Sequence, residues 1–259
     1  MYSKCVWKKY DNYDDIMKFN EEYKEFLSYG KTERLCVAKS IELAKQAGFK
    51  DIKEFDKLVP GDKVYAVNKC KNIAVFVIGE QPIENGLRVL GAHIDSPRLD
   101  LKQNPLYEQN GFALLDTHYY GGVKKYQWVT IPLAIHGVVC KKDGTTVTVA
   151  IGDEPNDPVV GISDLLIHLA GDQLSKPAGK VIEGEALDLT VGSIPLKDEE
   201  KATVKDNVLK LLKEKYDFEE EDFLSAELEI VPAGPARDYG LDRSMVAGYG
   251  HDDRVCAYS

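Results

Sequence analysis

The first fifty residues place apolar side chains at intervals of three and four among charged ones. Tyr13–Leu27 carries such an apolar stripe with Asp, Lys and Glu opposite, which is typical of an amphipathic helix. A second stripe follows Thr32, whose hydroxyl can cap a first helical turn, and Gly48 stands where a helix can end. The pattern therefore predicts two successive amphipathic helices.

Three short runs rich in Val, Ile and Phe come next, separated by Gly and Pro. Their bounds are Lys63–Val67, Asn72–Ile78 and Leu87–His93, and each is typical of a β-strand. Helices followed by strands favour an α/β layer. The third run would end with His93 in a polar cluster at the tip of a strand.

The region after Pro97 is β-rich. Thr130–Cys140 and Thr145–Ile151 are β-like runs, and the Asp143-Gly144 turn between them predicts a hairpin. Ile162–Leu174 is the one stretch of this region that favours a helix.

The remaining part alternates between types of element. Lys201–Tyr216 carries an apolar stripe that predicts a helix, and the acidic run Phe218–Asp222 is expected to be a solvated turn. Glu227–Val231 resembles a strand, and Pro232–Gly240 a loop. Because the pattern changes near residues 97 and 241, we expect a β-rich domain of residues 97–240. It would interrupt a discontinuous α/β domain of residues 1–96 and 241–259.

Charge and hydropathy exclude several classes of protein. The 259 residues include 33 Lys and Arg against 43 Asp and Glu, a net charge of -10, which argues against a nucleic-acid partner. The apolar run Ile73–Gly79 is far too short to span a bilayer, which takes about 20 apolar residues. The N-terminal residues lack the apolar core of a signal peptide. We therefore expect a cytoplasmic protein with no membrane partner.

The cysteines limit which side chains could bind a metal ion. The five cysteines stand singly, without a CxxC pair, so a zinc knuckle or a disulfide scaffold is not expected. Any metal ion would have to be bound by His and carboxylate side chains. No nucleophile elbow, phosphate-binding loop or dinucleotide-binding motif is present either.

His93 and Asp95 form the first candidate site. A His at the end of a strand can bind a metal through one ring nitrogen while a nearby carboxylate holds the other. A purely structural His–Asp pair is the alternative.

Asp252 and Asp253 form the second candidate site, in a glycine-flanked turn. One carboxylate of such a pair can bridge two metal ions about 3.5–4 Å apart. The alternative is an Asp that caps a helix beginning near Asp253. Only the fold could bring His93 and Asp252 together, because 159 residues separate them in the sequence.

Asp116–Trp128 is the third candidate, a segment dense in aromatic, glycine and basic residues. It could form a subunit interface or a substrate-facing edge, and the acidic chain disfavours a nucleic-acid stacking patch. His136 and His168 lie among apolar neighbours, where packing is the expected role.

Five segments together resemble the aspartyl aminopeptidase family, family eighteen of the metallopeptidases. The resemblance is to the N-terminal portion of a bacterial member. The segments are VLGAHIDSPRLDLKQNPLYE, THYYGGVKKYQWVTIPLAIHGVV, SDLLIHLAGDQ, EIVPAGPARDYGLDRSM and GYGHDDRVCAY.

This resemblance implies a fold and a site. The fold would be a discontinuous α/β catalytic domain interrupted by a β-rich dimerisation domain. His93 would be a metal ligand, Asp95 its orienting catalytic partner, and Asp252 the bridging ligand before a peptide bond to Asp253 that is often cis. The cofactor would be two zinc ions, with manganese or cobalt as alternatives, and the partners a peptide substrate and further copies of the chain.

The family pattern also implies ligands that this sequence does not contain. The general-base Glu and further Glu, Asp and His ligands would lie beyond Ser259, so the last part of the catalytic domain is expected to be absent. We therefore expect the 259-residue chain alone to be inactive. The alternative is a truncated, non-catalytic interaction or regulatory subunit.

Overall fold

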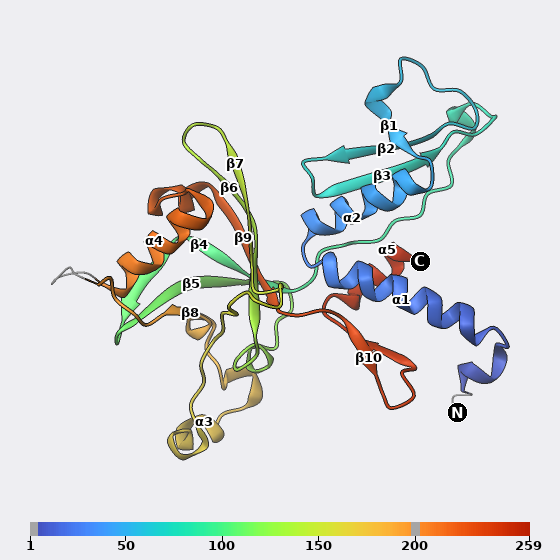
Figure 1. Cartoon of the computed structure of the whole chain (residues 1–259). Helices are drawn as coiled ribbons and strands as arrows, with labels where there is room; N and C mark the ends of the chain where they lie inside the picture. The colour runs from blue at the N-terminus through green and yellow to red at the C-terminus, as the bar shows by residue number, and fades with distance from the viewer. Residues whose placement is uncertain (1–4, 198–202) are drawn as a thin grey trace. The chain divides into compact units, whose positions relative to one another are not determined.

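The computed structural model describes residues 5–197 and 203–259 as two compact units (Figure 1). Unit 1 contains the chain up to residue 95 together with residues 235–259, and unit 2 contains residues 96–234. Unit 1 contains the first two candidate sites, His93 with Asp95 and Asp252 with Asp253.

Two helices form the first part of unit 1, as their patterns predict. They are α1 (Tyr13–Tyr29) and α2 (Glu33–Gln46). The Thr32 side chain accepts a hydrogen bond of 3.3 Å from the Leu35 amide at the start of α2. Gly48 follows the end of α2 with a φ of 85°, a left-handed conformation that glycine adopts without strain.

A three-stranded sheet follows, in the order β1-β2-β3. The strands are β1 (Lys50–Asp51), β2 (Lys63–Asn68) and β3 (Asn72–Val77). β1 is parallel to β2 and β3 is antiparallel to it, with α2 in contact with β2 and β3. The first two predicted strands are confirmed. Short 3-10 turns of this unit are Val6–Lys9, Ile52–Glu54 and Ile83–Asn85.

The third predicted strand, Leu87–His93, is wrong. The described residues 87–97 have no regular secondary structure, and the Leu90 side chain is fully exposed. A strand needs a neighbour that pairs with its backbone N–H and C=O groups, and no described strand runs beside this segment. His93 therefore lies on an extended connection rather than at a strand tip.

The end of the chain returns to unit 1. It forms a hairpin of β10 (Arg237–Tyr239) and β11 (Met245–Ala247), followed by α5 (His251–Tyr258). Tyr258 packs its ring against aromatic rings of α1, so α5 lies beside α1.

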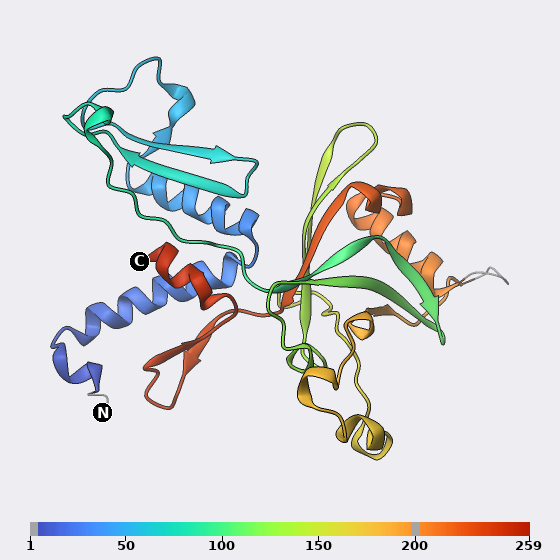
Figure 2. The ribbon, with the colours of Figure 1, turned by 180° about the vertical axis from the view of Figure 1, so that it is seen from behind.

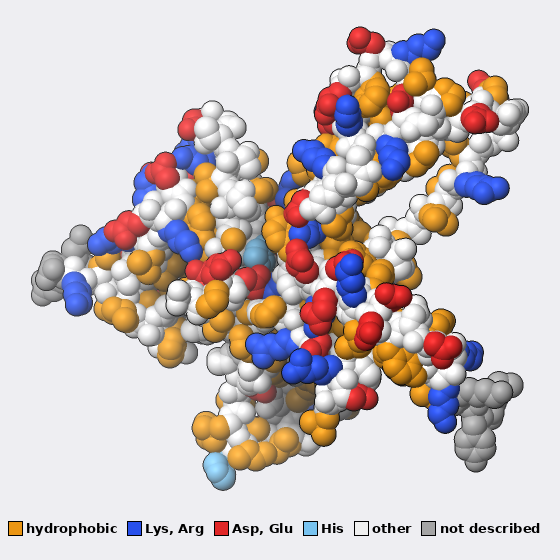
Figure 3. Space-filling view, turned by 45° about the vertical axis from the view of Figure 1, so that its right-hand side comes forward, with side chains coloured by type: hydrophobic (Ala, Val, Ile, Leu, Met, Phe, Trp, Pro, Cys, Tyr) orange, Lys and Arg blue, Asp and Glu red, His pale blue; other side chains and the backbone are white. Residues whose placement is uncertain are grey.

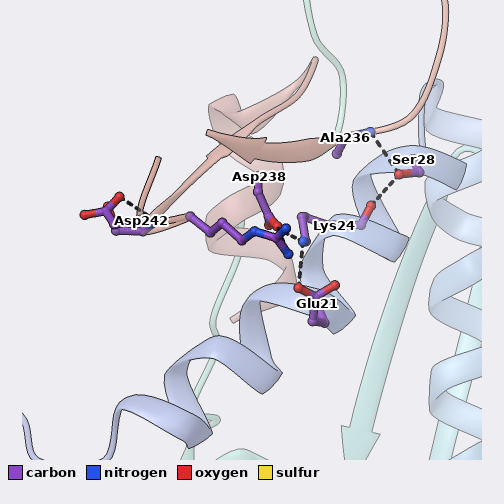
Figure 4. Close-up of polar contacts among 8 residues, drawn as sticks. Glu21, Lys24, Ser28, Ala236, Asp238 and Asp242 are labelled. Atoms are coloured by element: carbon purple, nitrogen blue, oxygen red, sulfur yellow. Dashed lines mark hydrogen bonds and ion pairs between the residues drawn. The ribbon is translucent and has the colours of Figure 1, made fainter. Parts of the chain in front are cut away.

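Contacts with α1 explain why unit 1 resumes before residue 240, earlier than the sequence predicts. Figure 4 shows Lys24 between Glu21 and Asp238, and Ser28 beside Ala236. The Ala236 amide donates to Ser28 Oγ at 3.0 Å. The expected loop 232–240 thus contains β10, and its second half is part of unit 1.

Unit 2 is built on one antiparallel sheet of six strands in the order β7-β6-β9-β4-β5-β8. Its strands are β4 (Arg98–Gln109), β5 (Phe112–Tyr120), β6 (Leu133–Cys140), β7 (Thr146–Ile151), β8 (Leu189–Gly192) and β9 (Ala226–Pro232). α4 (Val204–Tyr216) packs against β4, β5 and β8 (Figure 2). The predicted β6–β7 hairpin, the β9 strand and most of the α4 helix are confirmed. Residues 201 and 202 of that predicted helix lie outside the described residues.

One prediction in unit 2 is wrong and another holds only in part. The expected helix Ile162–Leu174 contains only a 3-10 turn, Ile167–Leu169, and the one-turn α3 (Gly171–Leu174). The Asp164 carboxylate accepts from the Leu165 amide and from Gln173, which favours a turn over a helix. The acidic run is solvated only in its middle: Glu219, Glu220 and Glu221 are exposed, whereas Phe218 and Asp222 are buried and Asp222 belongs to the 3-10 helix Glu220–Ser225. The other 3-10 turns are Lys125–Gln127, Ala178–Lys180 and Gly184–Ala186.

Two further expectations concern single histidines and membrane insertion. His136 is buried, and its Nε2 lies 2.6 Å from Asp153 Oδ2, so it is a satisfied core residue as predicted. His168 is exposed rather than packed. None of the described helices combines the length and the apolar character that crossing a bilayer requires.

Candidate metal centre

His93 and Asp252 come together in unit 1. His93 Nε2 lies 3.2 Å from Asp252 Oδ1, although 159 residues separate the two in the sequence. Asp252 stands at the beginning of α5, with non-helical backbone angles there and at Asp253. The peptide bond between these aspartates is cis, as the family resemblance implies. The convergence that the site hypothesis requires is therefore present.

Asp95 fixes the orientation of the His93 ring. His93 Nδ1 lies 3.0 Å from Asp95 Oδ1 and 3.1 Å from the Asp95 backbone oxygen. Both oxygens are acceptors, so these neighbours assign the ring hydrogen to Nδ1. The lone pair of the neutral ring is then on Nε2, which faces Asp252.

The charges around His93 favour a cation at this point. Burial lowers the pKa of His93, but the hydrogen bonds and negative charge of Asp95, with a contribution from Asp253, outweigh it and raise the pKa. A neutral Nε2 and a carboxylate oxygen would repel each other at 3.2 Å, since both are acceptors. A proton or a metal ion between the two atoms would remove this repulsion.

The donor atoms fit zinc as part of a site. Two ligands of a tetrahedral zinc ion, each about 2.0–2.2 Å from the metal, lie roughly 3.3 Å apart. The Nε2–Oδ1 distance of 3.2 Å matches this separation, and imidazole with carboxylate also suits manganese or cobalt. Within residues 5–197 and 203–259, no three His, Cys, Asp or Glu side chains are grouped to hold a metal ion. The described residues thus supply two donors.

Solvent reaches this pair of donors directly. The Asp252 side chain is 94% exposed and the His93 side chain 53% exposed. The neighbouring Asp253 carboxylate accepts a hydrogen bond from the Cys256 thiol, and this bond raises the pKa of the thiol. Both metal-donor candidates are therefore open to solvent within unit 1.

Side chains near His93 and Asp252 that the sequence did not indicate hold the turn before Asp252. His251 Nε2 lies 3.2 Å from the Val246 backbone oxygen, so it donates there and its Nδ1 accepts from Tyr23 OH at 3.0 Å. Burial raises the pKa of Tyr23 to about 12, which keeps the hydroxyl protonated. Arg254 is also buried here. The sequence signal that could have identified Tyr23 is its polar hydroxyl at an apolar position of the helical pattern.

The third candidate segment, residues 116–128, lies in unit 2 and mixes two roles. Trp128 is buried in the core, whereas Tyr119 and Tyr126 are about 40% exposed. Asp116 forms an ion pair of 2.8 Å with Lys102. The exposed aromatic rings remain available as a contact surface.

Comparison with known proteins decides the family. A protein-family model described as "Aminopeptidase I zinc metalloprotease (M18)" matches residues 26–259. The chain belongs to the M18 family. The resemblance noted from the five segments is thereby confirmed, and the mixed α/β fold is that of M18 aminopeptidase structures.

Individual M18 proteins are similar to this chain in sequence and in structure. A Clostridium acetobutylicum protein named "Probable M18 family aminopeptidase 1" is 59% identical over 99% of this chain and 57% of its own length. The crystal structure of an M18 family aminopeptidase from Thermotoga maritima has a TM-score of 0.93 and 48% identity. It covers all of this chain and 56% of that one. A Saccharomyces cerevisiae structure described as the "mApe1 dodecamer" shares the fold at 21% identity, with a TM-score of 0.68, over 95% of this chain and 54% of that one.

The M18 chain thus spans little more than half the length of the relatives it matches. These relatives are aminopeptidases of a zinc metalloprotease family. The alternative of a non-catalytic interaction subunit receives no support from them.

Proposed function

We propose that this chain contributes part of the dinuclear zinc site of an aminopeptidase that removes N-terminal residues from peptides. His93 and Asp252 are the metal ligands, and Asp95 is the catalytic partner that orients His93. The single observation that carries the proposal is the 3.2 Å approach of His93 Nε2 to Asp252 Oδ1. Membership of a zinc metalloprotease family supports it.

Each of the three side chains has a separate task. Asp95 keeps the hydrogen on Nδ1, so that Nε2 of His93 stays available as a donor. Asp252 has two carboxylate oxygens, and one can bind an ion beside His93 while the other binds a second ion. Zinc, when bound, supplies a Lewis acid and lowers the pKa of a bound water.

Zinc binding by the purified chain tests these assignments. His93→Ala and Asp252→Asn each remove one of two donors, so each should weaken zinc binding by at least about 10-fold in a competition titration with a coloured chelator. His118→Ala is the matched control, because His118 is an exposed histidine of unit 2. Equal zinc affinity in the wild-type chain and in both site variants would refute the assignment.

We also propose that the 259-residue chain alone is inactive. Catalytic zinc sites use three protein ligands plus water, and the described residues group only two donors. The chain with zinc, manganese or cobalt should therefore not hydrolyse N-terminal Asp, Glu or Leu anilides above the background rate. Robust metal-dependent turnover would show that the ligand count is mistaken.

The proposal also assigns unit 2, a β-rich unit, as a dimerisation domain of a homo-oligomer. Hydrophobic side chains gather over the segment that carries α3, in the lower part of Figure 3. More than half of each of these side chains is exposed: Leu165, Leu166, Ile167, Leu169 and Leu174. Exposed apolar clusters of this kind are typical of protein interfaces.

Light scattering tests this assignment with a matched pair of variants. Leu166→Glu places a charge in the apolar cluster and should shift the chain from oligomer to monomer. Leu211→Glu, at a similarly exposed leucine of α4, should leave the mass unchanged. A wild-type chain that is monomeric at all concentrations would contradict the dimerisation role.

A cytoplasmic location is part of the same proposal. None of the five cysteines forms a disulfide in the described part of the chain, which fits a reducing compartment. Cell fractionation with an antibody to the chain measures its location directly.

A further inference from the structure

Arg254 buries its guanidinium where three backbone segments of unit 1 meet. The side chain is only 1% exposed. Its Nε donates to the Ile94 backbone oxygen at 2.9 Å and its Nη2 to the Lys31 backbone oxygen at 3.0 Å. The Tyr249 ring lies 5.2 Å from the guanidinium carbon, within the range of a cation–π contact. One side chain therefore joins α5 to two distant segments.

The two donors of the candidate metal centre are direct neighbours of these bonds. Ile94 stands between His93 and Asp95, and Arg254 comes two residues after Asp252. The Nε bond thus links the backbone of one donor to the helix that carries the other, across 160 residues of sequence. A change at Arg254 would alter the spacing of the two donors without removing either.

The segment that carries His93 needs such a restraint. Residues 87–97 form no strand, so no ladder of backbone hydrogen bonds holds His93 in place. The Cys36 thiol also lies 4.0 Å from the Ile94 oxygen, and thiols are weak donors. The charged hydrogen bond from Arg254 is therefore the stronger of the two, and such bonds are short and directional.

Only arginine can make both backbone bonds at once. Its planar guanidinium holds five N–H donors in a fixed fork, so Nε and Nη2 point at two different carbonyls. A lysine ammonium at the same position is a single point of attachment. Replacement by lysine would keep the charge and lose the fixed geometry.

We propose that Arg254 is a positioning residue that sets the separation between His93 Nε2 and Asp252 Oδ1 and thereby the zinc affinity. This inference rests on the proposed metal site. Residues that orient metal ligands typically change affinity by about 10- to 100-fold when they are replaced. We expect a loss of zinc affinity in that range for Arg254→Lys.

Arg98 of unit 2 provides a matched control. It is also buried, its Nε donates to Asp100 Oδ1 at 2.8 Å, and its guanidinium carbon lies 4.4 Å from the Tyr120 ring. Arg98→Lys should therefore perturb packing in a similar way, but in unit 2, five residues after His93 in the sequence. Its zinc affinity should stay within about threefold of the wild-type value.

The experiment combines zinc titration with crystallography on the full chain. Both measurements are made well below the thermal midpoint of each variant, so that every sample is folded. In metal-free crystals, the Nε2–Oδ1 separation should increase by about 1 Å or more in Arg254→Lys and stay unchanged in Arg98→Lys. An unchanged separation together with unchanged zinc affinity would overturn the inference.

The two readouts keep this inference distinct from the proposed function. If the wild-type chain and His93→Ala bind zinc equally, the metal site fails, while the crystallographic separation still tests the positioning role. Arg254→Gln, which keeps one N–H donor group, replaces Arg254→Lys if the latter does not fold. If both variants unfold while Arg98→Lys folds, Arg254 acts on stability rather than position, and the inference is wrong.

Discussion

At the scale of single residues, Asp217 combines an unusual backbone conformation with two ion pairs. It ends α4 with a φ of 53°, in the left-handed region. Its carboxylate lies 2.8 Å from Lys141 Nζ and 2.8 Å from Lys213 Nζ. Hydrogen bonds from these lysines lower the pKa of Asp217 to about 2.

We therefore expect Asp217→Asn to destabilise unit 2 in a pH-dependent way. Asparagine tolerates the left-handed conformation, so the change isolates the charge. Because the folded pKa lies below the ordinary aspartate value of 3.8, the stabilisation is present above about pH 4 and is lost as the pH falls towards 2. The difference in urea midpoint between wild type and variant, measured at pH 7 and near pH 2, should shrink towards zero.

Glu214→Gln is the control for this prediction. Glu214 forms an exposed pair with Lys210 on the same helix, at 3.8 Å. Its replacement should change stability by less than about 0.5 kcal/mol at either pH. A pH-independent effect of Asp217→Asn would contradict the ion-pair explanation.

The residues of the candidate site differ in how far the sequence reveals them. His93, Asp95 and Asp252 stand in short motifs whose residue types match zinc chemistry, so the sequence alone proposes them as candidates. Arg254 was not, because its role depends on the carbonyls of Ile94 and Lys31, which only the fold brings to it. A motif gives the donor atoms, whereas their spacing is a tertiary property.

At the scale of elements, Gly137 determines how closely β6 and β9 approach each other. Its φ is 151°, and a Cβ added there would lie 1.9 Å from the Glu227 backbone oxygen. Backbone atoms of β9 cannot move aside without breaking the ladder. The close approach of the two strands therefore requires glycine.

Gly137→Ala should consequently destabilise unit 2 by at least about 2 kcal/mol in urea unfolding, in line with overpacking of a rigid site. Gly171→Ala is the comparison, because an added Cβ there meets nothing within 4 Å. It should change the free energy of unfolding by less than about 0.5 kcal/mol. Equal effects of the two substitutions would show that the strands can separate at Gly137.

Elements with a complete local pattern were the predictable ones. α1 and α2 have one apolar face each, and the β6–β7 hairpin has its turn residues in place. The runs at 87–93 and 162–174 are apolar without such a pattern. The first is irregular and exposed, and the second is mostly exposed and contains only two short helical turns. Their conformation depends on neighbours that a local pattern does not specify, which is why the sequence assigned them wrongly.

At the scale of the whole molecule, the two units should respond differently to zinc. The proposed ligands all belong to unit 1, and a ligand stabilises the part of a protein that binds it. In hydrogen exchange followed by mass spectrometry, zinc should slow exchange in peptides that contain residues 93–95 and 251–254. Peptides from the β4–β9 sheet of unit 2 should exchange at the same rate with and without zinc.

His93→Ala provides the control for this exchange experiment. It should abolish the zinc-dependent protection in unit 1 and leave the rates of unit 2 unchanged. Protection spread evenly over both units would mean that zinc binds elsewhere or that the units do not act independently. Removal of the metal with a chelator should reverse the protection.

The pairing of β4 with β9 has a consequence for how unit 2 can be accommodated within the chain. Leu99 lies opposite Ile230, so the first and last strands of the unit are neighbours in the sheet. The first and last residues of unit 2 therefore lie close together. Within the rest of the chain, unit 2 takes the place of a loop that joins two neighbouring positions. Such a loop can gain or lose a whole unit at a small cost in chain entropy. Residues 96–234 are for this reason a natural segment for excision, replacement or expression as a separate protein.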